Sequence, residues 1–165
     1  MDVSKSAEKI DTTVSKVIEY YDRIIFIRDK YIRKINKKLD ELENMINDAI
    51  RYANSGSKWL NIKIKKILKD IQDILDKCIE RIKEIISQIK EWYNKTMTDI
   101  KVSIITAVFA KLGQNISYDQ AMPLADAIPH PDIESLLPSI NIELNLPDLM
   151  NLGEIKEVKI PRIEI

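Results

Sequence analysis

Helix-breaking residues are almost missing from the first two thirds of this sequence, and this constrains the fold more than any other feature. All six Pro residues lie between Pro123 and Pro161, and the only Gly before Gly113 is Gly56. Since Gly and Pro oppose helix formation most strongly, long uninterrupted helices can form before Gly113. The sequence therefore predicts a helical body over residues 1–113 and a different C-terminal part over residues 114–165.

Apolar residues repeat every seven positions from about Val14 to Ala53, which is the pattern of a coiled-coil seam. Two further columns lie beside the first, so the stripe is wider than a two-stranded coiled coil requires. We predict one long amphipathic helix over this range. The first column consists of Ile18, Ile25, Ile32, Leu39, Ile46 and Ala53.

A second seven-residue pattern runs from about Trp59 to Leu112 and predicts a second long helix. Its flanking column drifts around the surface, as expected of a nearly straight helix with 3.6 residues per turn. Cys78 falls within the seam, so we expect a small buried apolar side chain there rather than a nucleophile. The flanking column includes Ile79, Ile86, Tyr93 and Ile100.

The residues 54–57 are predicted to form the turn between the two helices. Gly56 suits the C-cap of the first helix and Ser57 suits the N-cap of the second. This predicts a long antiparallel α-helical hairpin in which residue i faces about residue 111 − i. In that register, four acidic residues of the first helix lie opposite four lysines of the second: Asp40, Glu41, Glu43 and Asp48 opposite Lys63, Lys65, Lys66 and Lys69.

Two helices alone cannot cover apolar stripes three columns wide, because each helix has only one neighbour along its length. A second copy of the chain, another protein or the C-terminal part has to cover the remaining surface. We therefore predict a homo-oligomer or larger assembly. Its packing interface is predicted to use Ile18, Ile25, Ile32, Leu39, Ile46, Ile79, Ile86, Tyr93 and Ile100.

The C-terminal part begins with signals for two short helical pieces. The residues 117–120 have the spacing of a capping box, and Pro131 with Asp132 can open a single turn that runs to Leu137. The chain then changes to an alternation of apolar and polar residues from Ile140 to Leu146, which indicates a strand.

A second strand is predicted from Ile155 to Ile165, with Pro161 confining it to an edge or a bulge. The fold class is thus mainly α: a coiled-coil-like hairpin followed by an extended, Pro-containing C-terminal arm with a β-hairpin. The arm can fold back on its own hairpin or grip a neighbouring copy, and the sequence leaves both open. Its predicted contact residues are Ile140, Ile142, Leu144, Leu146, Val158 and Ile160.

The sequence offers little for catalysis. One Cys and one His cannot form a disulfide framework or a zinc site, and three separated Gly residues make no phosphate-binding loop. His130 lies between two Pro residues near Asp126 and Asp132, but no nucleophile accompanies it, so we expect a solvated side chain. We predict no enzymatic activity, no catalytic residue, no metal and no cofactor.

Charge leaves two alternative functions open. The chain balances 26 basic against 26 acidic residues, so it has no net charge to attract nucleic acid or membranes. A basic run on the first helix, with Arg28, Arg33, Lys34 and Lys37, could still contact the phosphates of a nucleic acid. The apolar stretch Val102–Ala110 is too short to span a bilayer, which takes about 20 residues, but it could lie on a membrane surface.

We interpret the chain as a non-enzymatic structural or assembly protein that self-associates through its helical hairpin and its C-terminal arm. A coat, tail or adaptor subunit of a viral or phage particle would suit this design. A nucleic-acid-binding or membrane-associating helical protein is the alternative. The first residues lack the apolar core of a secretory signal, so we expect a cytoplasmic or virion location.

Overall fold

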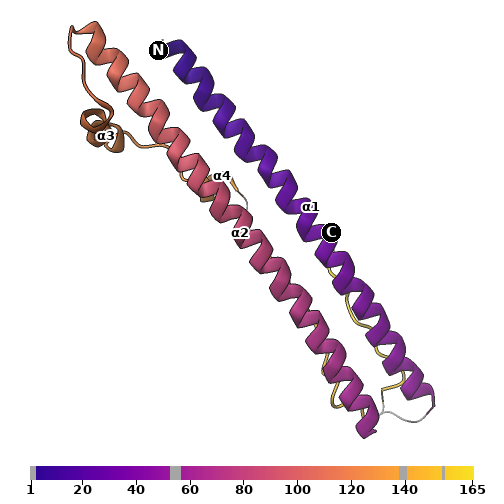
Figure 1. The fold of residues 1–165 in the computed structure, drawn as a ribbon. Coiled ribbons are helices and arrows are strands. Elements are labelled where there is room, and N and C mark those ends of the chain that lie inside the picture. The colour runs from indigo at the N-terminus through magenta and orange to yellow at the C-terminus, as the bar shows by residue number, and fades with distance from the viewer. Residues whose placement is uncertain (1–2, 53–56, 138–140, 154) are drawn as a thin grey trace. The chain divides into compact units, whose positions relative to one another are not determined.

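The computed structural model describes residues 3–52, 57–137, 141–153 and 155–165. It is mainly helical, and its two long helices, α1 (Val3–Arg51) and α2 (Lys58–Lys111), run antiparallel and pack together as a hairpin (Figure 1). Two short helices follow, α3 (Tyr118–Asp126) and α4 (Ile133–Leu136). The predicted hairpin is confirmed. Helix α1 begins earlier than the apolar pattern indicated, because the residues before Val14 contain no Gly or Pro that would stop a helix.

The helix ends follow the local sequence. The Ser57 hydroxyl accepts a hydrogen bond from the Leu60 N–H at 3.1 Å, which confirms Ser57 as the N-cap of α2, whereas Gly56 lies outside the described residues. Helix α2 ends at Lys111 and is followed by Gly113, whose φ of 78° is in the left-handed region that favours glycine. The Gln114 N–H donates to the Phe109 carbonyl at 2.9 Å, so α2 closes with a Schellman motif.

The two short helices also match their sequence signals. The Ser117 side chain accepts from the Gln120 N–H, and the Gln120 side chain accepts from the Ser117 N–H, so α3 opens with a complete capping box. Helix α4 is a single turn after Asp132. Both predictions for this stretch are confirmed.

The chain forms two compact units, and each contains a part of both long helices. Unit 1 consists of Met1–Ile24 and Lys83–Ser139, and unit 2 consists of Ile25–Ile82 and Ile140–Ile165. In unit 1, α3 packs on α2 through a small apolar cluster of Val102, Ile105, Ala121 and Ala125. Helix α4 adds the fully buried Ile133.

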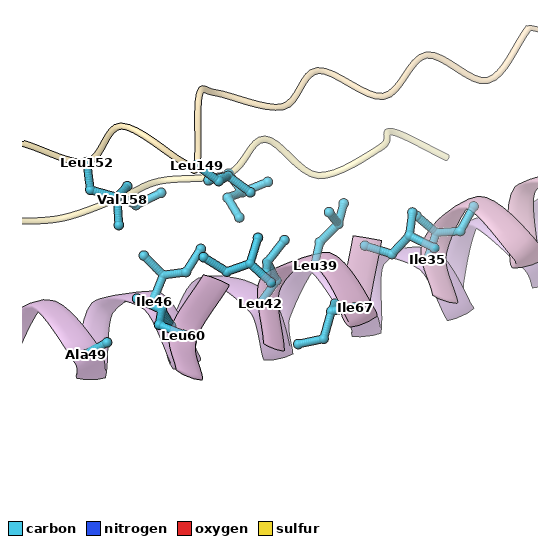
Figure 2. Close-up of a cluster of buried hydrophobic side chains, with 13 residues drawn as sticks. Ile35, Leu39, Leu42, Ile46, Ala49, Leu60, Ile67, Leu149, Leu152 and Val158 are labelled. Carbon is cyan, nitrogen blue, oxygen red and sulfur yellow. The ribbon is translucent and has the colours of Figure 1, made fainter. Parts of the chain in front are cut away.

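In unit 2, the hairpin is covered by residues 141–153 and 155–165, which we call the C-terminal segment. Figure 2 shows Leu149, Leu152 and Val158 of this segment lying over the apolar side chains of the helices. The segment therefore supplies, from the same chain, the cover that the wide apolar stripe needs. The helical members of this cluster are Ile35, Leu39, Leu42, Ile46 and Ala49 of α1 and Leu60, Ile64, Ile67 and Ile71 of α2.

The predicted β-hairpin arm is wrong for the described part of the chain, in which the C-terminal segment contains no strand. The predicted strands covered Ile140–Leu146 and Ile155–Ile165, of which Ile140 lies outside the described residues. The alternation in the second run does bury Val158 and Ile160. However, backbone groups of this run pair with side chains of α1 and not with another strand.

The predicted register is close to the observed one, but the predicted charge pairing is not. Tyr20 was expected opposite residue 91 and its ring lies 6.5 Å from that of Trp92. The four acidic residues that were predicted to face lysines of α2 pair with other cations. Asp40 and Glu43 pair with Arg162, Glu41 pairs with Lys38, and Asp48 pairs with Arg51.

Candidate functional site

Two asparagines of α1 hold the backbone of the C-terminal segment. The Asn36 side-chain amide donates to the Ile163 carbonyl and accepts from the Ile163 N–H, both at 2.9 Å. Asn47 pairs with Val158 in the same way, at 2.9 Å to the carbonyl and 2.7 Å from the N–H. Each carboxamide thus satisfies both polar backbone groups of one residue, as a neighbouring β-strand would do.

The spacing of the two asparagines fits an extended peptide. Asn36 and Asn47 are three helical turns apart, which places them on one face of α1 about 16 Å from each other. Val158 and Ile163 are five residues apart, and an extended backbone covers about 16 Å in five residues. The distance between the two asparagine side chains therefore matches the distance between the two residues of the segment that they bind.

Acidic side chains between the two asparagines hold the middle of the segment. The Glu43 carboxylate accepts from the Ile160 N–H at 2.8 Å and from the Arg162 guanidinium at 2.7 Å. Asp40 accepts from the same guanidinium at 2.6 Å. The Ile160 backbone hydrogen bond and Arg162 lower the pKa of Glu43 below its usual 4.5, so this carboxylate stays charged in the groove.

The opposite side of the same peptide is apolar. Val158 and Ile160 are buried in the cluster of unit 2, while the residues that alternate with them, Glu157, Lys159 and Pro161, are exposed. We call the surface formed by Asn36, Asp40, Glu43 and Asn47 with the apolar cluster below it the peptide groove. It is suited to binding an extended peptide through main-chain groups, two apolar side chains and one arginine.

The peptide groove was not predicted from the sequence. The signal was present: Asn36, Asp40, Glu43 and Asn47 are spaced four, three and four residues apart, which is the spacing of a helix face. Such a line of hydrogen-bonding side chains also borders the apolar stripe of an ordinary amphipathic helix, so it marks a face and does not name its partner. Apolar periodicity alone does not reveal it.

The residues predicted for the oligomer interface fall into three groups. Ile32, Leu39 and Ile46 are buried within unit 2, and Tyr93 and Ile100 are buried within unit 1. Ile25 and Ile86 are half-buried. Only Ile18 and Ile79 remain exposed, with 52% and 41% of their surface accessible.

The predicted arm contacts are divided as well. Val158 and Ile160 are buried in the peptide groove. Ile142 and Leu144 are half-buried, Leu146 is exposed, and Ile140 lies outside the described residues. The segment also buries Leu149 and Leu152, which were not among the predicted contacts.

The predicted nucleic-acid contacts do not form one cluster of equally accessible cations. Arg28 binds Asp29 at 3.0 Å and is half-buried. The Lys34 ammonium lies 5.2 Å from the centre of the Tyr31 ring. Arg33, Lys34 and Lys37 are exposed on α1. In the apolar stretch proposed for membrane contact, Val102 and Ile105 are buried against α3.

Unit 1 contains a polar cluster around Lys101 and His130 that the sequence pattern did not predict. Lys101 is buried, and its ammonium binds the Ile128 carbonyl and lies 2.7 Å from the His130 ring nitrogen Nδ1. The expectation of a solvated His130 was wrong, because its ring also packs edge-on against Tyr93. The Tyr93 hydroxyl donates to the Pro131 carbonyl at 2.7 Å.

The protonation of this cluster is set by burial. Burial and the neighbouring Lys101 charge lower the pKa of His130 below 6.5, although Asp132 opposes the shift. Burial also lowers the pKa of Lys101. The cluster ties the stretch before α4 to α2. Cys78 is buried as predicted, and burial raises the pKa of its thiol.

Within the described residues, no group of three or more His, Cys, Asp and Glu is close enough to hold a metal ion. No helix in this part of the chain is long and apolar enough to cross a membrane. The sequence matches no known family and no curated protein, and no solved structure matches the fold.

Proposed function

We propose that this protein is a non-enzymatic assembly protein that self-associates when the C-terminal segment of one copy binds in the peptide groove of another. The paired contacts of Asn36 and Asn47 with the backbone of Ile163 and Val158 carry this proposal. They hold a segment whose described residues form no helix or strand, so the binding energy comes from the groove.

The same contacts can be made by the chain's own segment or by that of a second copy. Exchange of an identical element keeps every hydrogen bond and every apolar contact, and it changes only the entropy of association. The own segment is favoured at low concentration, because a tethered segment has an effective concentration in the millimolar range for a short flexible link. Exchange between copies is then favoured as the protein concentration rises.

Exposed apolar residues on the helices support side-by-side contact in the same assembly. Ile18 in unit 1, and Phe26 and Ile79 in unit 2, are large apolar side chains on the surface. Single exposed residues of this kind are common in monomers. Their role here is to widen a contact that the exchanged segment begins.

Two complementary variants test the exchange. One variant ends at Gly153, so it has an open groove and no Val158 or Ile163. The other carries Asn36→Ala and Asn47→Ala, so it has an intact segment and a weakened groove. We expect a mixture of the two to form a one-to-one complex in light scattering. Two separate monomers in the mixture would contradict binding in trans.

The full-length chain tests self-association directly. We expect its solution mass to rise above the monomer mass of 19.1 kDa across a hundredfold increase in concentration. The matched control is Asn44→Ala, which removes an exposed asparagine from the same helix and should leave the rise unchanged. A mass of 19.1 kDa at every concentration would overturn the proposal.

A further inference from the structure

The first three turns of α2 carry a concentration of positive charge. Five lysines and no acidic residue lie between Lys58 and Lys69, and all five lysines are exposed. Two large apolar side chains stand among them on the surface, Trp59 with 54% and Ile62 with 58% of its area accessible. The five lysines are Lys58, Lys63, Lys65, Lys66 and Lys69.

Helical geometry brings most of these residues together. Leu60, Ile64 and Ile67 face the core of unit 2. At 100° per residue, the direction opposite to this core carries Ile62 in its centre, with lysines above and below it and Trp59 to one side. We call this surface the outward face of α2. It consists of Lys58, Trp59, Ile62, Lys65, Lys66 and Lys69.

Acidic residues of α1 that could offset this charge are engaged elsewhere. Glu43 and Asp40 bind Arg162, and Asp48 binds Arg51. Asp70, the first acidic residue after the lysines, lies 3.8 Å from Lys38. The neutral total charge of the chain therefore hides a local positive surface.

We propose that the outward face of α2 docks on the surface of a membrane that contains anionic lipids. Lysines near such a surface are attracted by the negative headgroups, while tryptophan and a neighbouring aliphatic side chain enter the boundary between headgroups and acyl chains. Tyr52, at the other side of the hairpin connection, is 77% exposed and of a type enriched at membrane interfaces.

The apolar residues favour a membrane over a nucleic acid. Both partners would attract the lysines, and a base could stack on Trp59. Ile62 lies in the centre of the outward face. Its aliphatic side chain can neither bind a phosphate nor stack on a base of a nucleic acid. In a membrane, the same side chain gains from leaving water, and the lysine stems can extend their charges to the headgroups.

The direct test uses the two tryptophans as matched probes. The full chain with Trp92→Phe keeps only Trp59, and the full chain with Trp59→Phe keeps only Trp92. Both are mixed with vesicles of 30% phosphatidylserine in phosphatidylcholine that carry brominated acyl chains. We expect quenching and a blue shift for Trp59 and neither change for Trp92. Equal quenching of both, or quenching of neither, would overturn the proposal.

Charge variants test the electrostatic part. Lys65→Glu with Lys66→Glu should reduce partition into the anionic vesicles at least tenfold, since one basic residue at such a surface is worth about fivefold. The control, Lys30→Glu with Lys37→Glu on exposed positions of α1, should change partition less than threefold. Circular dichroism verifies that both variants remain helical.

Lipid and nucleic-acid arms separate the two partners. Pure phosphatidylcholine vesicles, or anionic vesicles in 1 M salt, should bind at least tenfold more weakly than anionic vesicles at physiological salt. Binding of a 20-nucleotide single-stranded RNA, lost in the Lys65→Glu/Lys66→Glu variant, together with no vesicle binding, would assign this face to nucleic acid and end the membrane proposal. None of these outcomes depends on exchange of the C-terminal segment.

Discussion

In both units the two long helices are covered by a later part of the chain, but the covering segments differ in their secondary structure. In unit 1 the cover includes two short helices, α3, which opens with a capping box, and α4, which is a single turn. In unit 2 the cover is the C-terminal segment, which has neither helix nor strand in its described residues. The backbone N–H and C=O groups of its described residues are therefore not paired by the hydrogen bonds of a helix or a sheet.

The difference shows what a hairpin must supply to each kind of cover. A helical cover needs apolar contacts, and Ala121 and Ala125 provide them against α2. An extended cover brings unpaired N–H and C=O groups to the surface of the core, and these need partners if they are buried. In unit 2 the hairpin provides Asn36, Glu43 and Asn47 for this purpose.

Removing the end of the extended cover should give the largest effect. A chain that ends at Gly153 loses the burial of Val158 and Ile160, each worth about 1.5 to 3 kcal/mol. We expect unit 2 to lose about 3 to 6 kcal/mol of stability. Hydrogen exchange should show faster exchange of the amides of residues 35–50. The amides of residues 90–105 in unit 1 serve as the internal control. Equal loss of protection in both units would contradict the separation into two units.

The amide pairs should give the next largest effect. Asn36→Ala or Asn47→Ala leaves one N–H and one carbonyl of the segment without the groove's partner. We expect a loss of about 1 to 3 kcal/mol for each variant, measured by denaturant unfolding at the protein concentration where the chain is monomeric. Asn44→Ala, an exposed asparagine on the same helix, should stay within about 0.5 kcal/mol. Equal effects of all three substitutions would show that helix propensity and not the amide pairs is measured.

Tyr93 and Lys101 of α2 each bind a non-helical backbone carbonyl in unit 1, and Tyr93 offers the cleaner test because it carries no charge. Tyr93→Phe keeps the ring against His130 and removes the hydrogen bond to the Pro131 carbonyl. We expect a loss of about 0.5 to 1.5 kcal/mol, confined to the amides of unit 1. The smaller value follows because one bond is removed instead of two. A loss as large as that of Asn47→Ala would mean that unit 1 depends on backbone capture as much as unit 2.

The sequence predicted the helical body well and its cover less well. Long helices, their register, the caps at Ser57 and Ser117 and the turn at α4 follow from local rules that act within a few residues. The width of the apolar stripe also predicted, correctly, that a further element covers the two helices. That cover turned out to lie in the chain itself, where the C-terminal segment and α3 bury apolar side chains on the hairpin.

Strand prediction failed because alternation reports only which side chains are buried. Val158 and Ile160 alternate with exposed residues, as in a strand, and both are buried. The alternation does not predict which group binds the backbone N–H and C=O groups. Asn36 and Asn47 are more than 100 residues away in sequence from the residues they bind, so no local pattern connects them. His130 was misjudged for the same reason, because Lys101 and Tyr93 reach it from α2.

We expect the two units to lose stability in different pH ranges as acid is added. This should be the smallest of the effects, since the titrating groups remain partly exposed to solvent. The folded pKa of His130 is below 6.5, so the unfolded chain binds a proton first as the pH falls below that value. Unit 1 should therefore lose stability as the pH falls from 6.5 through the lowered folded pKa. In unit 2 the corresponding group is Glu43, whose stabilising charge is complete above pH 4.5 and is lost as the pH falls below it.

The measurement is denaturant unfolding from pH 7.5 to 3.5 with Trp92 as the reporter of unit 1, in a Trp59→Phe background. The loss of stability that begins as the pH falls below 6.5 should disappear in His130→Gln, because the group that binds the additional proton is gone. Glu43→Gln should leave that change in place and alter only the stability of unit 2 below pH 4.5. Hydrogen exchange of residues 35–50 measures this stability. A pH dependence of unit 1 that persists in His130→Gln would assign the effect to other groups and remove the difference between the two units in this pH range.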